Sequence, residues 1–243
     1  MSHDAFFVGW RGRGALPLSG FLVGVGLLVM VVFGGLALTL GSVVNDPGGG
    51  DFAGDKDLTG VVVAEPYPLL VLDPDAAHPD GHAVLMSGGG KRGVQAQAAS
   101  LAGRRAHATG AGFKRGSIDM LLVATLDPAE GAAPEVVVTA LGTWRLTGEI
   151  CDGKCVSGVM RPGDGLAHKA CANVCISGGV PPVLVTTAPV EGAGFLLMGD
   201  PNGHALPDTF RDRTGIPQRM DGRVERIADV LIFRTDVTAA VTP

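Results

Sequence analysis

Leu58-Thr59-Gly60 precedes a run of valines, and the same three residues return as Leu146-Thr147-Gly148. Further along the chain, each copy reaches a glycine that leads into a pair of apolar runs, at Gly110 in the first copy and at Gly222 in the second. From Gly60 to Gly110 is 50 residues and from Gly148 to Gly222 is 74, so the second copy is longer by 24. This self-similarity predicts two related modules. The alternative is one irregular β domain in which the short repeat is accidental.

Short β-type runs surround both copies. They are rich in Val, Ile, Leu and Thr, and Gly and Pro separate them, as is typical of strands. One helix is expected, at Val94–Ala102. The predicted strands are Leu58–Glu65, Leu69–Leu72, His82–Met86, Arg105–Thr109, Met120–Thr125, Glu135–Ala140, Trp144–Ile150, Val183–Thr187, Gly194–Met198, Gly222–Ile227 and Val230–Arg234.

The position of the helix identifies the kind of module. Five strands with a helix after the third fit the small oligonucleotide/oligosaccharide-binding (OB) barrel. We therefore expect a mainly β protein with two OB-like barrels, one over residues 58–140 and one over residues 141–243. The 24-residue excess of the second module matches the length of a segment that carries cysteine and histidine.

An apolar run extends from Leu16 to Leu40, inside a stretch without charge from Gly14 to Asn45. About 20 helical residues span a hydrocarbon core of about 30 Å, so the run predicts a transmembrane helix over residues 16–40. Signal peptides usually have a shorter apolar region, of about 7–15 residues. We therefore favour an uncleaved signal anchor over a cleaved signal or a buried core helix.

Flanking charges predict the orientation of this helix. Arg11 and Arg13 precede it, whereas Asp46, Asp51 and Asp55 follow it. Lys and Arg favour the cytoplasmic side. We expect residues 1–15 to form a cytoplasmic tip and residues 41–57 a tether. The protein would then lie in the inner membrane of a bacterium, in contact with lipid, with its bulk in the periplasm.

The overall composition excludes several classes of function. Charged residues make up 18% of the chain and apolar residues 46%, which is not the composition of a disordered chain. The net charge is −5 and aromatic residues are 5%, which argues against a nucleic-acid partner. The sequence has no G-x-S-x-G elbow, so a common hydrolase signature is missing. We assign no catalytic residues and favour a protein that is not an enzyme.

All four cysteines, Cys151, Cys155, Cys171 and Cys175, fall within 25 residues. A helix over Leu166–Ile176 would place His168, Cys171 and Cys175 on one face. Cys155 could supply a fourth ligand, and Asp152 or Cys151 a supporting or alternative one. Three thiolates with one imidazole suit tetrahedral zinc. Thiolates also suit copper(I) or an iron–sulfur cluster.

Other interpretations of these cysteines remain open. In an oxidising compartment, four cysteines commonly form two disulfides, and three pairings are possible. A redox-active pair or a covalent cofactor site is a further alternative. The spacing is neither C-x-x-C-H nor C-x-x-C, so haem attachment and a thioredoxin-like site are not indicated.

Two other motifs receive a structural interpretation. Ser87–Arg92 is glycine-rich and ends in Lys-Arg, but it lacks the pattern of a phosphate-binding loop, so we expect a turn. His78 and His82 lie among the aspartates Asp73, Asp75 and Asp80 and could bind a metal ion. A solvated turn is the preferred interpretation of that segment.

The second module resembles a class of bacterial exported or membrane-anchored OB-like domains. The resemblance covers about residues 146–236 and rests on D-x-x-C at Asp152, H-x-x-C-A-x-x-C at His168 and the turn Gly178–Pro182. It implies a shared set formed by Asp152, Cys155, His168, Cys171 and Cys175. Cys151 stands where that pattern usually has an aliphatic residue. The resemblance implies no particular reaction.

Together these features favour an accessory or assembly subunit of a larger envelope complex, of a respiratory or redox kind, with an integral membrane protein complex as its partner. One alternative is an electron-transfer protein or redox enzyme that uses a metal or cluster. A second alternative is a disulfide-stapled module that binds another protein.

Overall fold

The computed structural model describes residues 16–43 and 48–241. The chain divides into two units, Met1–Val44 and Asn45–Pro243, and each is described by itself. The expected cytoplasmic tip, residues 1–15 with its two arginines, lies outside the described residues.

The first unit contains one helix, α1 (Leu16–Val43). Within it, Leu18–Gly41 has a mean hydropathy of 2.7 over its most apolar window. These 24 residues extend about 36 Å, enough to cross a hydrocarbon core. The side chains of residues 20–41 are exposed, unlike those of a core helix. The helix therefore fits a membrane anchor or a signal sequence.

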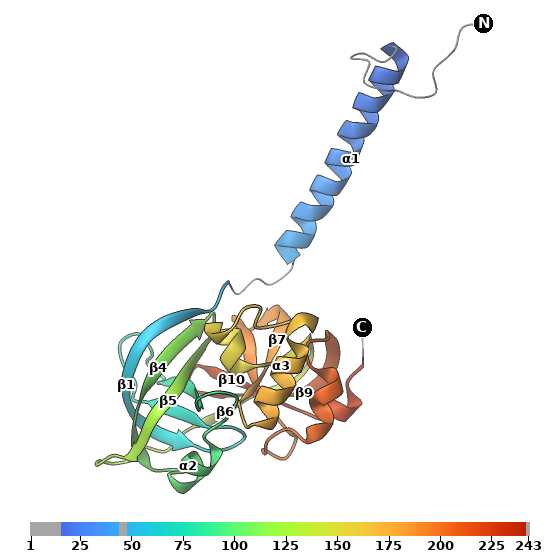
Figure 1. The fold of residues 1–243 in the computed structure, drawn as a ribbon. Coiled ribbons are helices and arrows are strands. Elements are labelled where there is room, and N and C mark those ends of the chain that lie inside the picture. The colour runs from blue at the N-terminus through green and yellow to red at the C-terminus, as the bar shows by residue number, and fades with distance from the viewer. Residues whose placement is uncertain (1–15, 44–47, 242–243) are drawn as a thin grey trace, which may run out of the picture. The chain divides into compact units, whose positions relative to one another are not determined.

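The second unit begins with a closed five-stranded barrel (Figure 1). Its strands follow the order β1-β2-β3-β5-β4, and only β3 and β5 pair in parallel. The helix α2 (Gln95–Ser100) lies between β3 and β4 in the chain, as expected for an OB barrel. The strands are β1 (Asp51–Val63), β2 (Leu69–Leu72), β3 (His82–Ser87), β4 (Arg105–Arg115) and β5 (Ile118–Pro128).

A second closed barrel follows with the same topology, in the order β6-β7-β8-β10-β9 and with β8 and β10 parallel. The prediction of a mainly β protein with two OB-like barrels is confirmed. The strands are β6 (Val138–Asp152), β7 (Pro182–Val190), β8 (Ala193–Gly199), β9 (Gln218–Ile227) and β10 (Val230–Thr235). This barrel also carries the helix α3 (Lys169–Ser177) and the short helical turns η1 (Cys155–Val159), η2 (Leu166–His168), η3 (Asp208–Arg213) and η4 (Val237–Ala239).

The repeated glycines occupy matching positions in the two barrels. Gly60 and Gly148 lie in the first strand of each barrel, and Gly110 and Gly222 lie in the fourth. A Cβ atom at any of the four would collide with a carbonyl oxygen of the neighbouring strand. These glycines therefore allow the close backbone approach of strongly bent barrel strands. The carbonyls concerned belong to Val71, Val185, Leu122 and Arg234.

The structure differs from the expected elements at two places and locates the excess of the second module. Strand β1 begins at Asp51, so residues 51–57, expected in the tether, pair with β4. The two strands expected around Gly142 form one long strand, β6, because Gly142 adopts a φ of 93° at an irregularity in its pairing with β9. The first and second strands are joined by residues 64–68 in one barrel and by residues 153–181 in the other, which locates the 24-residue excess.

The two barrels share a hydrophobic core. Ala98 of α2 packs against the core of the first barrel, whereas Ile176 of α3 and Phe210 of η3 pack against the core of the second. A third cluster joins Tyr67, Leu85 and Met120 of the first barrel to residues of the second that include Phe195. The barrels therefore form one unit, and the insertion between β6 and β7 lies against their junction.

Candidate metal centre

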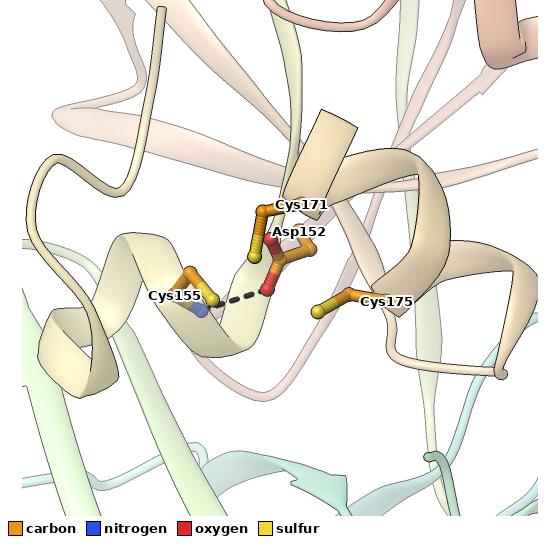
Figure 2. A group of neighbouring side chains, drawn as sticks. All are labelled: Asp152, Cys155, Cys171 and Cys175. Carbon is orange, nitrogen blue, oxygen red and sulfur yellow. Dashed lines mark hydrogen bonds between the residues drawn. The ribbon is translucent and has the colours of Figure 1, made fainter. Parts of the chain in front are cut away.

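Four side chains converge at the start of the insertion: Asp152, Cys155, Cys171 and Cys175 (Figure 2). One carboxylate oxygen and the three Sγ atoms all lie within 4.8 Å of one another. Asp152 is fully buried, Cys155 and Cys175 are nearly so, and Cys171 is partly exposed. These are ligand types that zinc and copper(I) accept.

The local structure explains how these residues meet. Successive side chains of a strand point to opposite faces, so at the end of β6 Cys151 enters the core between the barrels while Asp152 faces the insertion. Oδ1 of Asp152 accepts a hydrogen bond of 2.8 Å from the backbone N–H of Cys155, which fixes the start of η1. Cys171 and Cys175 are one helical turn apart on α3 and share a face.

His168 approaches the cluster from a different side. It is 3% exposed, and its Nε2 lies 2.8 Å from Oδ2 of Asp152. The sequence suggests His168 together with the three thiols as the ligand set and Asp152 as a supporting or alternative ligand, and the structure groups Asp152 with the thiols. The reason is that His168 ends the turn η2 ahead of α3, where its ring reaches the carboxylate. The hydrogen bond with Asp152 raises the pKa of His168.

Two lysines that sequence reasoning had not linked to the site lie beside it. Nζ of Lys91 is 2.8 Å from Sγ of Cys171 and 3.9 Å from Sγ of Cys175. Lys154 is 3% exposed and donates to the carbonyls of Gly88 and Gly90, at 2.7 and 2.5 Å. The glycine-rich loop of the first barrel is thus a turn, as expected, that delivers a cation to the cysteines. Its Gly-Lys-Arg sequence was the available signal.

The thiols and lysines of the cluster shift one another's pKa values. The thiol of Cys155 donates to Cys175, which raises the pKa of Cys155 and lowers that of Cys175. The hydrogen bond with Cys171 raises the pKa of Lys91, whereas burial lowers that of Lys154. Three thiolates and one carboxylate carry four negative charges. A divalent ion together with the two lysines would balance them.

All four cysteines are free thiols in the structure. Cys151 lies apart from the other three, with its Sγ 3.5 Å from Oε1 of Glu149, and burial raises its pKa. The alternative of two disulfides therefore finds no support, because the fourth cysteine has no nearby partner among the described residues.

The spacing of the ligand atoms favours a single ion. With metal–sulfur bonds of about 2.3 Å, tetrahedral geometry places sulfurs about 3.8 Å apart. This separation is compatible with ligand atoms that all lie within 4.8 Å of one another. An iron–sulfur cluster spreads its cysteine sulfurs further, because several metal atoms lie between them. The group Asp152, Cys155, Cys171 and Cys175 could therefore hold one metal ion.

A second group of ionisable residues lies where a solvated turn was expected. That expectation is wrong for His82, whose side chain is 16% exposed and contacts two carboxylates. Its Nε2 lies 2.8 Å from Asp119 and its Nδ1 lies 2.6 Å from Asp229. The first carboxylate belongs to the first barrel and the second to the turn between β9 and β10, so His82 joins the two barrels.

Comparison of the chain with models of protein families, with curated proteins and with solved structures gave no match. The resemblance to exported OB-like domains therefore rests on the quoted residues alone.

Proposed function

We propose that this protein is a membrane-anchored, extracytoplasmic metal-binding subunit whose second barrel holds one zinc ion at Asp152, Cys155, Cys171 and Cys175. The observation that carries the proposal is the convergence of three thiols and a buried carboxylate within 4.8 Å. Four such ligands around one centre match a closed, structural zinc site, which has no open position for a substrate.

The packing of the insertion supports a structural role for the metal. Its own small core consists of Cys155, Cys175 and Val180, with Cys171 packed against them. Three of these four side chains are thiols, so little aliphatic surface stabilises residues 153–181 at this point. Metal binding to such a segment supplies folding free energy directly.

The environment of the protein also favours bound metal. The apolar helix α1 would hold the barrels at a membrane, and Arg11 and Arg13 would keep the N-terminus in the cytoplasm. In an oxidising compartment, three neighbouring thiols would otherwise tend to pair. A single anchor and a closed metal site suit an accessory or assembly subunit of an envelope complex, in which the metal shapes a surface for the partner.

A redox-active dithiol is the second candidate. Cys171 is the most accessible of the three clustered thiols, and the ammonium of Lys91 lies 2.8 Å from its sulfur. The pKa of the neighbouring Cys175 is lowered, chiefly by its hydrogen bond with Cys155, and a lowered pKa favours the reactive thiolate. In that case the protein would carry no stoichiometric metal, and oxidation would remove two of the three clustered thiols.

Metal analysis with thiol counting separates these functions. Full-length protein purified in detergent without chelator should contain about one equivalent of zinc. Cys155→Ser should lose it, whereas Cys151→Ser, which removes a cysteine outside the cluster, should retain it. The zinc proposal fails if the wild type carries no stoichiometric metal or if both variants retain it equally. Copper or iron in place of zinc would keep the site and correct the ion.

The extracytoplasmic location has its own test. A reporter fused after Pro243 that is active only outside the cytoplasm should give a signal, and a reporter that is active only in the cytoplasm should not. Replacing Arg11 and Arg13 by Glu should weaken this preference, because the charge bias orients the helix. A cytoplasmic C-terminus in the wild type would overturn the location and the argument from oxidation.

A further inference from the structure

We propose a second, separate metal site at the junction of the barrels, formed by His78, His82 and Asp229. It would take a borderline divalent ion such as Zn²⁺ through two imidazoles and one carboxylate. The two histidines belong to the first barrel and its loop between β2 and β3, and Asp229 belongs to the turn between β9 and β10. A bound ion would therefore clasp one barrel to the other.

The three candidate ligand atoms already lie together. One ring nitrogen of each histidine and one oxygen of Asp229 are all within 4.8 Å of one another. The two imidazole rings stack, with centroids 4.5 Å apart and planes inclined by 27°. Both histidines are partly buried and Asp229 is exposed, so solvent and ions can reach the group.

Neighbouring groups hold the ligands in the manner of known metal sites. A metal-bound histidine usually donates its other ring N–H to a carboxylate or carbonyl. Nε2 of His82 lies 2.8 Å from the largely buried Asp119, which leaves Nδ1 facing Asp229. Nδ1 of His78 lies 3.2 Å from Asp75, which also accepts the backbone N–H of His78.

Asp229 is positioned as well. Its Oδ1 accepts a hydrogen bond of 2.8 Å from the backbone N–H of Ala83, so Oδ2 is the oxygen directed at His82. Each of the three ligands thus has one polar atom fixed by a neighbour, and the remaining atoms of His82 and Asp229 face each other. That arrangement goes beyond a random surface cluster of acidic groups.

Only a small movement would admit an ion. Nδ1 of His82 lies 2.6 Å from Oδ2 of Asp229. In tetrahedral zinc geometry, with bonds of about 2.0–2.2 Å, this separation would be about 3.3 Å. The exposed side chain of Asp229 can move far enough to increase the separation of these two atoms by that amount. The ion would replace the proton shared by these two atoms, so binding releases one proton to solvent.

The donor set defines the chemistry of this site. Three protein ligands leave a position for water, which differs from the closed thiol site. Two imidazoles with one carboxylate favour zinc, iron(II), cobalt(II) or nickel(II) over copper(I) or magnesium. The inference does not depend on the thiol site, because the two groups share no residue and differ in ligand type.

Cobalt(II) is a probe that distinguishes the two sites in the full-length protein. Cobalt bound by thiolates gives intense sulfur-to-metal charge-transfer absorption, whereas cobalt bound by imidazole and carboxylate gives only weak visible bands. We expect one equivalent with the intense absorption and a second without it. The second should bind at least about tenfold more weakly in His78→Phe, which keeps the stacked ring, and in Asp229→Asn. His107→Phe is the control, because His107 pairs with Asp57 elsewhere on the first barrel.

The outcomes separate the two proposals. The proposed site at His78, His82 and Asp229 is overturned if the wild type binds no second equivalent of cobalt. It is also overturned if both His78→Phe and Asp229→Asn bind the second equivalent as tightly as the wild type. Loss of the second equivalent in His107→Phe as well would also overturn it, because the effect would then be nonspecific. If the weak bands appear without any charge-transfer absorption, the site at His78, His82 and Asp229 is supported and the thiol site proposed above fails.

Discussion

His168 and Asp152 form a buried pair in which Nε2 of the imidazole lies 2.8 Å from Oδ2 of the carboxylate. The other carboxylate oxygen holds the backbone N–H of Cys155. The imidazole therefore orients a candidate ligand without joining the thiols. In metal sites, mutation of such a supporting partner typically lowers the metal affinity by about 10–100-fold.

This pair predicts different effects for its two members. His168→Ala should still bind one equivalent of metal, but with an affinity lower by about 10–100-fold. His168→Gln should recover part of the loss, because an amide can donate to Asp152. Asp152→Ala should lose the ion at chelator concentrations that His168→Ala withstands. A competition titration with a chromophoric chelator measures all three, and complete loss of metal in His168→Ala alone would make His168 the ligand.

Lys154 should contribute to the stability of the fold, although lysine is usually a solvent-exposed residue. Its ammonium is buried and donates to the carbonyls of Gly88 and Gly90 in the first barrel. Lys154→Met would leave these acceptors without a donor, so we expect a loss of about 1–3 kcal/mol in the free energy of unfolding. Denaturant titration measures this loss. Lys169→Met is the control, because Lys169 makes one exposed contact with Asp212, and an equal loss there would contradict the argument.

The sequence allowed the fold to be predicted better than the site. Alternating apolar residues and repeated glycines reflect the local needs of a barrel strand, which are one buried face and close backbone contacts. Gly60 and Gly148 occupy equivalent strand positions, as the repeat implied. Lys91 was missed because 80 residues separate it from Cys171, and only the packing of the two barrels brings them together. The contact between His168 and Asp152 depends on a single short turn, η2, which spacing along an ideal helix does not capture.

Gly148 offers a direct test of the barrel repeat. A Cβ atom there would collide with the carbonyl oxygen of Val185, which belongs to the rigid backbone of β7. Gly148→Ala should therefore destabilise the protein by about 1–3 kcal/mol or prevent folding. Gly89→Ala meets no atom within 4 Å and should leave the unfolding midpoint nearly unchanged. Similar midpoints for the two variants, measured by circular dichroism, would contradict the equivalence of the glycines.

The pair of carboxylates around His82 predicts a pH dependence in metal-free protein. The hydrogen bond with Asp119, followed by that with Asp229, raises the pKa of His82 to about 9. Because the folded pKa exceeds the unfolded value of about 6.5, the stabilisation is complete below about pH 6.5 and is lost as the pH rises through about 9. Lys114, which lies 3.4 Å from Asp119, and the stacked His78 are further ionisable groups nearby.

The measurement is the free energy of unfolding between pH 6 and 10 with chelator present. The wild type should lose up to about 3 kcal/mol more than His82→Gln over this interval, since both proteins share the titration of all other groups. The difference between the two curves isolates His82. Parallel curves would show that the two carboxylates do not hold a charged imidazole.

The residues that follow the anchor contact the segment that carries Cys155. The carbonyl of Gly50 accepts a hydrogen bond of 2.6 Å from Arg161 of that segment, and the carbonyl of Gly48 accepts one of 2.6 Å from Arg115 of β4. Gly50 also packs directly against the backbone of Ser157 and Gly158 in η1. Removal of residues 1–47 should therefore yield a soluble, folded protein with unchanged metal content, because the described barrel contacts all lie beyond that point.

Removal of residues 1–54 should have a different result. The barrel would lose the start of β1 and the backbone against which η1 packs, so the position of Cys155 would be less well fixed. We expect a lower unfolding temperature and a weaker affinity for metal than in the shorter truncation. Thermal unfolding and chelator competition on both proteins check this expectation. Equal values would show that residues 48–54 contribute nothing to the site, and aggregation of the shorter truncation would show that the barrels need the anchor or a partner to remain soluble.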